Sequence, residues 1–175
     1  MNTIKKHTIY TIGHSTHSIE EFIAMLQAFD IKIVADIRSL PGSNKFPQFN
    51  QDNLKIALEE VGIQYLHLTD LGGRRKAKKD SKNTSWKNIS FRGYADYMET
   101  EQFENAVQNM EAIAEEETLA YMCSEAVWWR CHRSMVSDYL KAKNWEVFHI
   151  MGVGKVQEHR YTEPARIVKN KVLYT

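Results

Sequence analysis

Short apolar runs alternate with longer segments of helical periodicity along most of the chain. The short runs are rich in β-branched and aromatic residues, which predicts five strands. The segments between them repeat apolar residues at spacings of three and four, which predicts amphipathic helices. The expected strands are residues 7–12, 31–37, 63–68, 119–122 and 146–150, and the expected helices are residues 19–29, 52–61, 94–98, 101–116 and 130–143.

Alternating strands and helices are typical of a parallel sheet with right-handed crossovers. We therefore expect residues 1–175 to form a single three-layer α/β domain. Its sheet is expected to be mostly parallel, five-stranded and Rossmann-like, in the order 3-2-1-4-5, with helices on both faces. In that order strands one and four adjoin a topological switch point, so His14 and Cys123 should face each other across one crevice. Residues 166–174 are expected to form a short hairpin around Asn170.

Residues 74–92 form a basic insertion in this pattern. They include eight basic residues and one acidic residue, Asp80. Such a run is typical of a mobile surface loop, and solvation is the simplest interpretation of its lysines. The lysines concerned are Lys76, Lys78, Lys79 and Lys82.

The overall composition narrows the class of protein. Hydrophobic residues make up 43% of the chain, which is typical of a globular protein. The net charge is +1, so the overall charge by itself points neither to a polyanion nor to an acidic partner. No apolar run approaches the roughly 20 residues that span a bilayer, so no membrane association is expected. Two cysteines cannot form a disulfide framework, and a cytoplasmic location is expected. These features leave the oligomeric state open.

Polar and charged side chains follow each of the first four predicted strands. Loops are polar in any protein, but the turns at the opposite ends of these strands look ordinary. The carboxyl ends of parallel strands share one edge of a sheet, and ligands bind at that edge in open α/β folds. The side chains concerned are His14 and Ser15, Asp36 and Arg38, Arg74 and Arg75, and Cys123 and Glu125.

Residues 121–133 hold the densest group of reactive side chains, including both cysteines. Cys123 is a candidate nucleophile, because a helix N-terminus and nearby arginines lower the pKa of a thiol. A small buried residue at the end of a strand is the alternative interpretation. Six residues separate Cys123 from Arg130, where the low-molecular-weight and protein phosphatases have five, and two of the six are tryptophans. The phosphatase pattern therefore fits poorly.

Three other side chains are candidate acid–base groups. Glu125 lies close in sequence to Trp128, and an aromatic environment raises the pKa of a carboxylate enough for it to act as a general acid. Asp36 and His14 are the other two candidates. A structural salt bridge to a neighbouring arginine is the alternative for both carboxylates, and it is favoured more strongly for Asp36.

By type, two cysteines and two histidines are also possible metal ligands. Their spacing matches no common zinc or iron–sulfur pattern, so neither a metal nor a cofactor is predicted. The residues concerned are Cys123, Cys131, His132 and His14.

Arginine forks suit phosphate and carboxylate groups, and several arginines are expected at the same edge of the sheet. We therefore expect an enzyme of the hydrolase or transferase type that acts on a phosphate-bearing substrate, either a nucleotide or a nucleic acid. The alternatives are a non-catalytic nucleic-acid-binding module that uses the basic insertion, and a thiol-redox or metal protein. The expected substrate-binding residues are Ser15, Arg38, Arg74, Arg75, Arg130, His132 and Arg133, with Trp128 as a stacking face.

Seven short motifs, which follow one another from about residue 8 to residue 151, together resemble the domain-of-unknown-function 488 family. The combination is specific, although no single motif is. The resemblance implies a compact α/β domain of bacteria and archaea, and it implies no reaction. This chain departs from the family pattern at residues 127–129 and at Asn44 and Lys45. The motifs are residues 11–15 (TIGHS), 36–39 (DIRS, with Pro41), 47–50 (PQFN), 71–75 (LGGRR), 93–98 (GYADYM), 122–125 (MCSE) and 131–133 (CHR).

Overall fold

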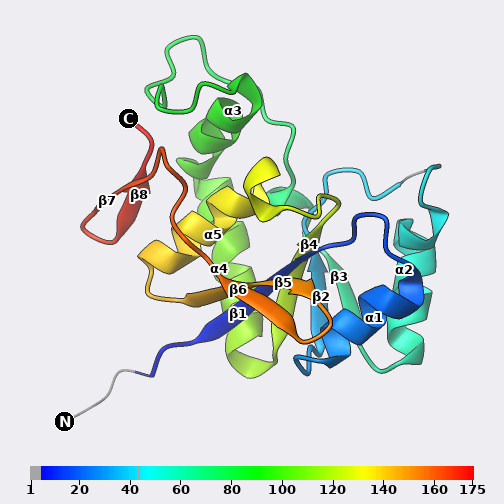
Figure 1. Cartoon of the computed structure of the whole chain (residues 1–175). Helices are drawn as coiled ribbons and strands as arrows, with labels where there is room; N and C mark the ends of the chain where they lie inside the picture. Colours follow the sequence, from blue (N-terminus) through cyan, green and yellow to red (C-terminus); the bar gives the residue numbers. More distant parts are fainter. Residues whose placement is uncertain (1–4, 43) are drawn as a thin grey trace.

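The computed structural model describes residues 5–42 and 44–175. Its centre is a six-stranded sheet in the order β3-β2-β4-β1-β5-β6 (Figure 1). Strands β1 to β5 pair in parallel, and β6 is antiparallel to β5. The expected α/β class with a mostly parallel sheet is confirmed. The strands are β1 (Thr8–Gly13), β2 (Ile33–Asp36), β3 (Gln64–His67), β4 (Leu119–Cys123), β5 (Glu146–Gly152) and β6 (Lys155–Glu158).

Helices cover both faces of the sheet and make three layers (Figure 1). In β4, Tyr121 belongs to the core under α3, α4 and α5, whereas Met122 belongs to the core under α1 and α2. Neighbouring residues of one strand therefore pack into opposite layers, as the alternation of side chains along a strand requires. The helices are α1 (Ile19–Gln27), α2 (Gln51–Glu60), α3 (Ile89–Met98), α4 (Glu101–Glu116) and α5 (Arg133–Ala142).

The expected strand order 3-2-1-4-5 is wrong at its centre, because β4 lies between β2 and β1. Hydrophobic periodicity identifies a strand but not its neighbours, and right-handed crossovers permit either order. All five residues of β4 are buried, which suits a strand that is paired on both edges and covered on both faces. Strands β1 and β4 remain neighbours, with Gly13 opposite Cys123.

Local sequence signals set several element boundaries. The Ser18 hydroxyl accepts a hydrogen bond from the backbone N–H of Glu21, so α1 begins at the predicted cap. Helix α3 begins earlier than expected, because the Asn88 side chain caps it. Helix α5 begins later, at Arg133, because residues 128–130 form a separate 3₁₀ turn, η3 (Trp128–Arg130).

The expected C-terminal hairpin is confirmed. Strand β7 (Arg166–Val168) pairs antiparallel with β8 (Lys171–Leu173). The two residues between them, Lys169 and Asn170, have φ angles of 50° and 63°. Two residues with positive φ form a turn whose twist matches that of the flanking strands.

The basic insertion folds against α3. The buried carboxylate of Asp96 accepts hydrogen bonds from the Lys78 backbone N–H (2.8 Å), the Ser81 hydroxyl (2.6 Å) and the Asn83 amide (2.7 Å). Burial tends to raise the pKa of Asp96, but these hydrogen bonds outweigh it and lower the pKa below its usual value. Both ends of residues 78–83 are thus held to the domain, while the lysine side chains 76, 78, 79 and 82 are exposed.

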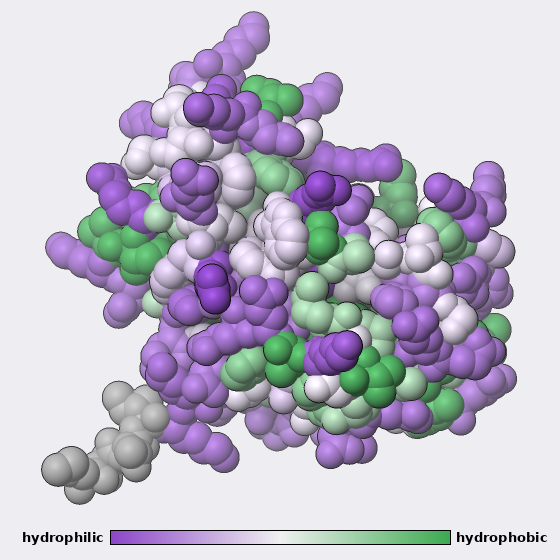
Figure 2. Space-filling view, viewed as in Figure 1, coloured by the Kyte–Doolittle hydropathy of each residue, from purple (hydrophilic) through white to green (hydrophobic). Residues whose placement is uncertain are grey.

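The face of the molecule in Figure 2 is largely hydrophilic, with hydrophobic residues in small separate groups. Within residues 5–42 and 44–175, none of the helices has the length and apolar character needed to cross a bilayer.

Candidate functional site

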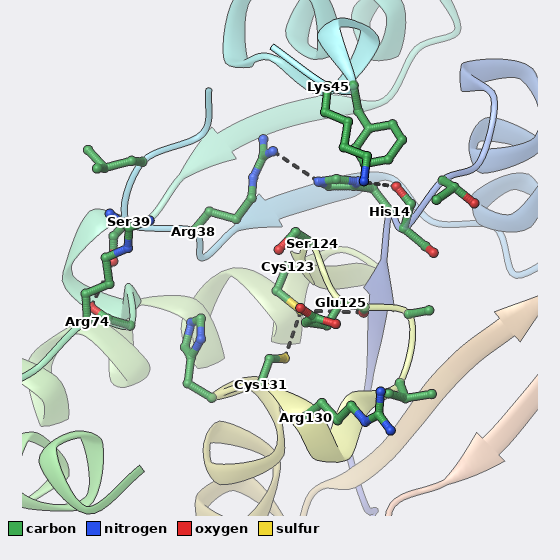
Figure 3. Close-up of a pocket in the computed structure, with 18 of the residues that line it drawn as sticks. His14, Arg38, Ser39, Lys45, Arg74, Cys123, Ser124, Glu125, Arg130 and Cys131 are labelled. Carbon is green, nitrogen blue, oxygen red and sulfur yellow. Dashed lines mark hydrogen bonds between the residues drawn. The ribbon is translucent and has the colours of Figure 1, made fainter. Parts of the chain in front are cut away.

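A cleft of about 730 Å³ opens at the carboxyl edge of the sheet, where the loops after β1, β2, β3 and β4 meet (Figure 3). The structure therefore brings residues from distant parts of the chain to one place, as expected of parallel strands. Eight of the twelve predicted site residues line this cleft: His14, Ser15, Arg38, Arg74, Cys123, Glu125, Arg130 and His132.

Asp36 holds Arg38 in place below the cleft. Its carboxylate is fully buried and accepts hydrogen bonds from Arg38 Nε (2.9 Å) and Nη2 (2.7 Å). The Tyr65 hydroxyl donates a further bond to the same carboxylate, at 2.5 Å. The salt bridge considered as the alternative for Asp36 is thus present, and this carboxylate serves as an anchor for a guanidinium at the cleft wall.

His14 is fixed by both of its ring nitrogens. Arg38 Nη1 lies 3.3 Å from Nε2, and Nδ1 lies 2.9 Å from the Ser15 carbonyl oxygen. A guanidinium can only donate and a carbonyl can only accept, so the proton is on Nδ1. The ring also stacks on Phe49 at 4.4 Å. Burial lowers the pKa of His14 to about 4, so the ring is neutral near pH 7 and serves to position Arg38.

The two cysteines contact each other inside the cleft. The Sγ atoms of Cys123 and Cys131 are 2.9 Å apart, and both thiols are free. Burial tends to raise the pKa of the Cys123 thiol, but a hydrogen bond from Cys131 and the charge of Arg133 outweigh it and lower the pKa to about 7. Burial, together with the neighbouring Cys123, raises the pKa of Cys131 well above its usual value. Of the two thiols, Cys123 is therefore the one that ionises more readily.

Arg133 lies behind the thiols and outside the cleft. It is only 1% exposed, and its Nη2 donates to the Glu125 carbonyl oxygen at 2.9 Å. Its backbone N–H contacts Cys131 Sγ at 3.4 Å. Burial tends to lower the pKa of Arg133, but the neighbouring cysteines raise it overall, so the guanidinium supplies a fixed positive charge to the thiol pair. Its Nε has no hydrogen-bond partner in the described part of the chain.

A buried chain of hydrogen bonds leads from Arg133, at the start of α5, through other elements and back to Asp138 of the same helix. Arg133 Nη1 contacts the Thr11 hydroxyl (3.3 Å), which contacts His149 Nδ1 (2.6 Å). His149 Nε2 contacts His159 Nδ1 (2.8 Å), and His159 Nε2 contacts the Asp138 carboxylate (2.8 Å). All five side chains are buried. We call these five residues the polar relay.

Cationic groups dominate the cleft lining. Arg38, Lys45, Arg74 and Arg130 are arranged around the two cysteines in Figure 3. Among the described residues that line the cleft, Glu125 is the one carboxylate. His132 adds no charge near pH 7, because burial lowers the pKa of its ring to about 4. The described lining of the cleft therefore carries more positive than negative side chains.

Four of the predicted site residues do not line the cleft. Besides Asp36 and Arg133, Arg75 lies over the Tyr97 ring at 3.7 Å and donates to the Gly72 carbonyl oxygen. Trp128 stacks on His149 at 4.5 Å, so that face of its indole is covered. Neighbouring residues of η3 therefore point to different sides, and sequence proximity to Cys123 does not bring a side chain into the site.

Several residues of the site were not predicted. Lys45 and Cys131 line the cleft, and Tyr65 supports Asp36. One of these residues, Asp138, could have been found from the sequence, because it shares the buried face of α5 with Met135 and other apolar residues. A carboxylate on an apolar helix face is rarely buried without partners, so its position indicates a polar network.

Gly13 allows the loop after β4 to cross the end of β1. A Cβ atom at this position would lie 1.7 Å from the Glu125 carbonyl oxygen. The His14 backbone N–H donates to the Cys123 carbonyl oxygen at 3.0 Å, and Ser15 N–H donates to the Ser124 carbonyl oxygen at 2.9 Å. The two loops are therefore joined directly above the sheet, and only glycine fits between them.

The two cysteines and two histidines considered as metal ligands do not form a metal-binding group. Within residues 5–42 and 44–175, no cluster of three or more histidine, cysteine or carboxylate side chains has the arrangement of a metal site.

The fold and the site together define an α/β protein with a cationic cleft and a contacting thiol pair at the carboxyl edge of its sheet. The model of a family described as domain of unknown function DUF488 matches residues 18–140. This match covers more than half of the 175 residues, and the chain belongs to that family. The resemblance noted from the sequence motifs is thereby confirmed. No curated protein and no solved structure matches the chain.

Proposed function

We propose that this protein is an enzyme that acts on a phosphate-bearing substrate, with Cys123 as its nucleophile. The observation that carries the proposal is the position of the Cys123 thiol in a cleft with four cationic side chains and one carboxylate. A thiolate is a strong nucleophile, and surrounding cations both favour the thiolate and bind anionic oxygens.

Each group has a role in this proposal. Arg74 and Arg130 are exposed at the cleft and hold anionic oxygens of the substrate. Arg38 has five N–H donors, and its bonds to Asp36 and His14 use three of its side-chain N–H groups, so two remain for a ligand. The Cys123 thiolate attacks the electrophilic centre beside the bound anion. The bond to the leaving group breaks as the bond to Cys123 Sγ forms, and the leaving group takes a proton from solvent. Glu125, which lines the same cleft, then acts as the base for the water that hydrolyses the adduct and releases the product from Cys123.

Binding and turnover can be tested separately. Titration calorimetry of the reduced protein with inorganic phosphate, nucleoside phosphates and single-stranded oligonucleotides identifies the ligand class. We expect Arg74→Ala and Arg130→Ala each to weaken binding by about tenfold, which is the effect of losing one charge-assisted contact. Lys55→Ala is the matched control, because Lys55 is exposed on α2 and away from the cleft. Equal affinities in the wild type, the two arginine variants and the Lys55→Ala control would exclude the cleft as the anion site.

Cys123→Ser tests the chemistry. It should retain the ligand and abolish turnover, because a hydroxyl has a far higher pKa than a thiol. Turnover at the wild-type rate in this variant would exclude Cys123 as the nucleophile.

The nucleic-acid-binding module is the second candidate function, and the exposure of the lysines between Lys76 and Lys82 favours it. Replacing all four lysines by glutamine removes their charge and leaves the Asp96 anchor intact, because Asp96 binds Ser81, Asn83 and a backbone N–H. If the protein is a nucleic-acid-binding module, this variant should lose its affinity for oligonucleotides and the steep dependence of that affinity on salt. Arg74→Ala and Arg130→Ala should then keep both properties.

A further inference from the structure

Cys123 and Cys131 are brought into contact by two different elements. Cys123 is the last residue of β4, and Cys131 lies between η3 and α5. Their sulfur atoms are 2.9 Å apart, and both residues line the cleft. Residues 124–130 connect them as a surface loop in which most side chains are exposed or partly exposed. Two thiols in contact need little movement of the chain to form a bond, provided that the loop can adjust.

The two thiols have different environments, which gives them different chemical roles. The hydrogen bond from Cys131 and the Arg133 charge favour the thiolate of Cys123, against the effect of burial. Either sulfur can donate in this contact, and the raised pKa of Cys131 makes it the thiol that keeps its proton. In a dithiol centre the thiol with a pKa near the ambient pH attacks first, and the second thiol resolves the mixed disulfide.

We infer that Cys123 and Cys131 form a redox-active pair that reduces a small anionic disulfide and is itself oxidised to the Cys123–Cys131 disulfide. This activity goes beyond the proposed function, because it does not require a phosphate on the substrate. The cationic lining made by Arg38, Lys45, Arg74 and Arg130 selects for the anionic charge of the disulfide.

The reaction has two exchange steps. In the first, the Cys123 thiolate attacks one sulfur of the disulfide, a mixed disulfide forms at Cys123, and the first thiolate leaves. In the second, Cys131 loses its proton to solvent and attacks Cys123 Sγ, and the second thiolate leaves. The protein dithiol loses two electrons and two protons, and the small disulfide gains them and becomes two thiols. Arg133 stabilises the negative charge on either sulfur during both steps.

Mass spectrometry of the intact chain after reaction with oxidised glutathione tests the inference. In the reduced wild-type protein the two thiols should become one disulfide. Its mass should therefore fall by two hydrogen atoms, and no glutathione should be retained. Cys131→Ser should stop at the mixed disulfide and retain one glutathionyl group. At pH 7 Cys123→Ser should react with oxidised glutathione at least about 100-fold more slowly than the wild type, because the remaining thiol, Cys131, is almost fully protonated. Circular dichroism of both variants checks that they are folded.

The charge preference is tested with two disulfides. Arg130→Ala should slow the reaction with oxidised glutathione by roughly threefold to tenfold and slow the reaction with the neutral hydroxyethyl disulfide by a smaller factor. Lys55→Ala, the control on α2, should change neither rate.

Three outcomes would overturn the inference: wild-type protein that retains glutathione, wild-type protein that keeps both thiols, or folded Cys123→Ser that reacts at the wild-type rate. These outcomes are independent of the proposed function. Phosphate-ligand binding and turnover are measured on the reduced protein, whereas the thiol reactions are followed by mass in the absence of any phosphate compound.

Discussion

Arg133 and Asp138 lie at opposite ends of the polar relay, so its five hydrogen-bonded side chains run from a guanidinium to a carboxylate. Arg133 can only donate, so the Thr11 hydroxyl accepts from it, and the same hydroxyl shares a hydrogen bond with His149 Nδ1. The Asp138 carboxylate accepts a hydrogen bond from His159 Nε2, and His159 Nδ1 shares a hydrogen bond with His149 Nε2. Burial lowers the pKa of His149 to about 2, so this ring is neutral near pH 7.

The polar relay therefore connects the buried Arg133 guanidinium to the buried Asp138 carboxylate through Thr11, His149 and His159. Asp138 also accepts hydrogen bonds from the Thr162 backbone N–H, the Thr162 hydroxyl and the Tyr174 hydroxyl. Buried charges are costly unless they are paired or hydrogen-bonded, and these contacts meet that requirement for Asp138. They also tie the C-terminal segment to α5 and hold the Arg133 charge beside the thiols.

Thr11→Val tests the polar relay with little change of shape. The variant removes the acceptor for Arg133 Nη1 and the hydrogen-bond partner of His149 Nδ1, so two buried polar groups lose a partner. We expect the free energy of unfolding to fall by about 1–3 kcal/mol, measured by urea denaturation. Thr8→Val on the same strand is the control, since Thr8 is only half-buried and should cost less. Equal losses in the two variants would contradict a special role for the relay.

The pH dependence of alkylation reports the Cys123 thiolate. Because the pKa of Cys123 is lowered to about 7, its reaction rate with iodoacetamide should rise with pH and reach half of its maximum near pH 7. Cys131→Ala removes the hydrogen bond that favours the thiolate, so the midpoint should move to higher pH. A midpoint that stays in place would show that Cys131 does not stabilise the thiolate.

His14 makes stability depend on pH. Burial lowers the pKa of His14 from 6.5 to about 4, so between these values the unfolded chain binds a proton that the folded chain excludes. The stabilising contribution is fully present above pH 6.5 and is lost as the pH falls toward 4, with a slope of about 1.4 kcal/mol per pH unit.

Urea denaturation at pH 7 and pH 5 measures this loss. His14 alone should lower the free energy of unfolding by roughly 2 kcal/mol between the two values. His14→Gln should make the difference smaller by that amount. The same pH difference in variant and wild type would be incompatible with a buried neutral imidazole at this position.

Gly13→Ala tests the junction between the loops after β1 and β4. The added Cβ would lie 1.7 Å from the Glu125 carbonyl oxygen, so one loop must move. We expect a loss of stability of about 1–3 kcal/mol, as for overpacking of a close contact, and slower alkylation of Cys123 as its loop is displaced. Gly42→Ala is the control, because nothing lies within 4 Å of a Cβ at that position. Unchanged thiol reactivity in Gly13→Ala would indicate that the loop adjusts without moving Cys123.

The sequence by itself determined the fold class and much of the cleft lining. The strand at residues 119–122 and the helix cap at Ser18 were predicted correctly, because hydrophobic periodicity and capping are properties of short stretches. Eight predicted site residues line the cleft. They could be predicted because the carboxyl ends of parallel strands share one edge whatever the order of the central strands.

The tertiary structure alone decided which side chains meet. The order of β4 and β1, the contact of Cys123 with Cys131 and the direction of Arg133 had no local signal. The polar relay joins β1, β5, α5 and the residue that follows β6, which are distant in sequence. Periodicity along the chain specifies which face of an element is buried. Which side chains meet depends on the register and the order of these elements. Both are established only when the whole domain packs together.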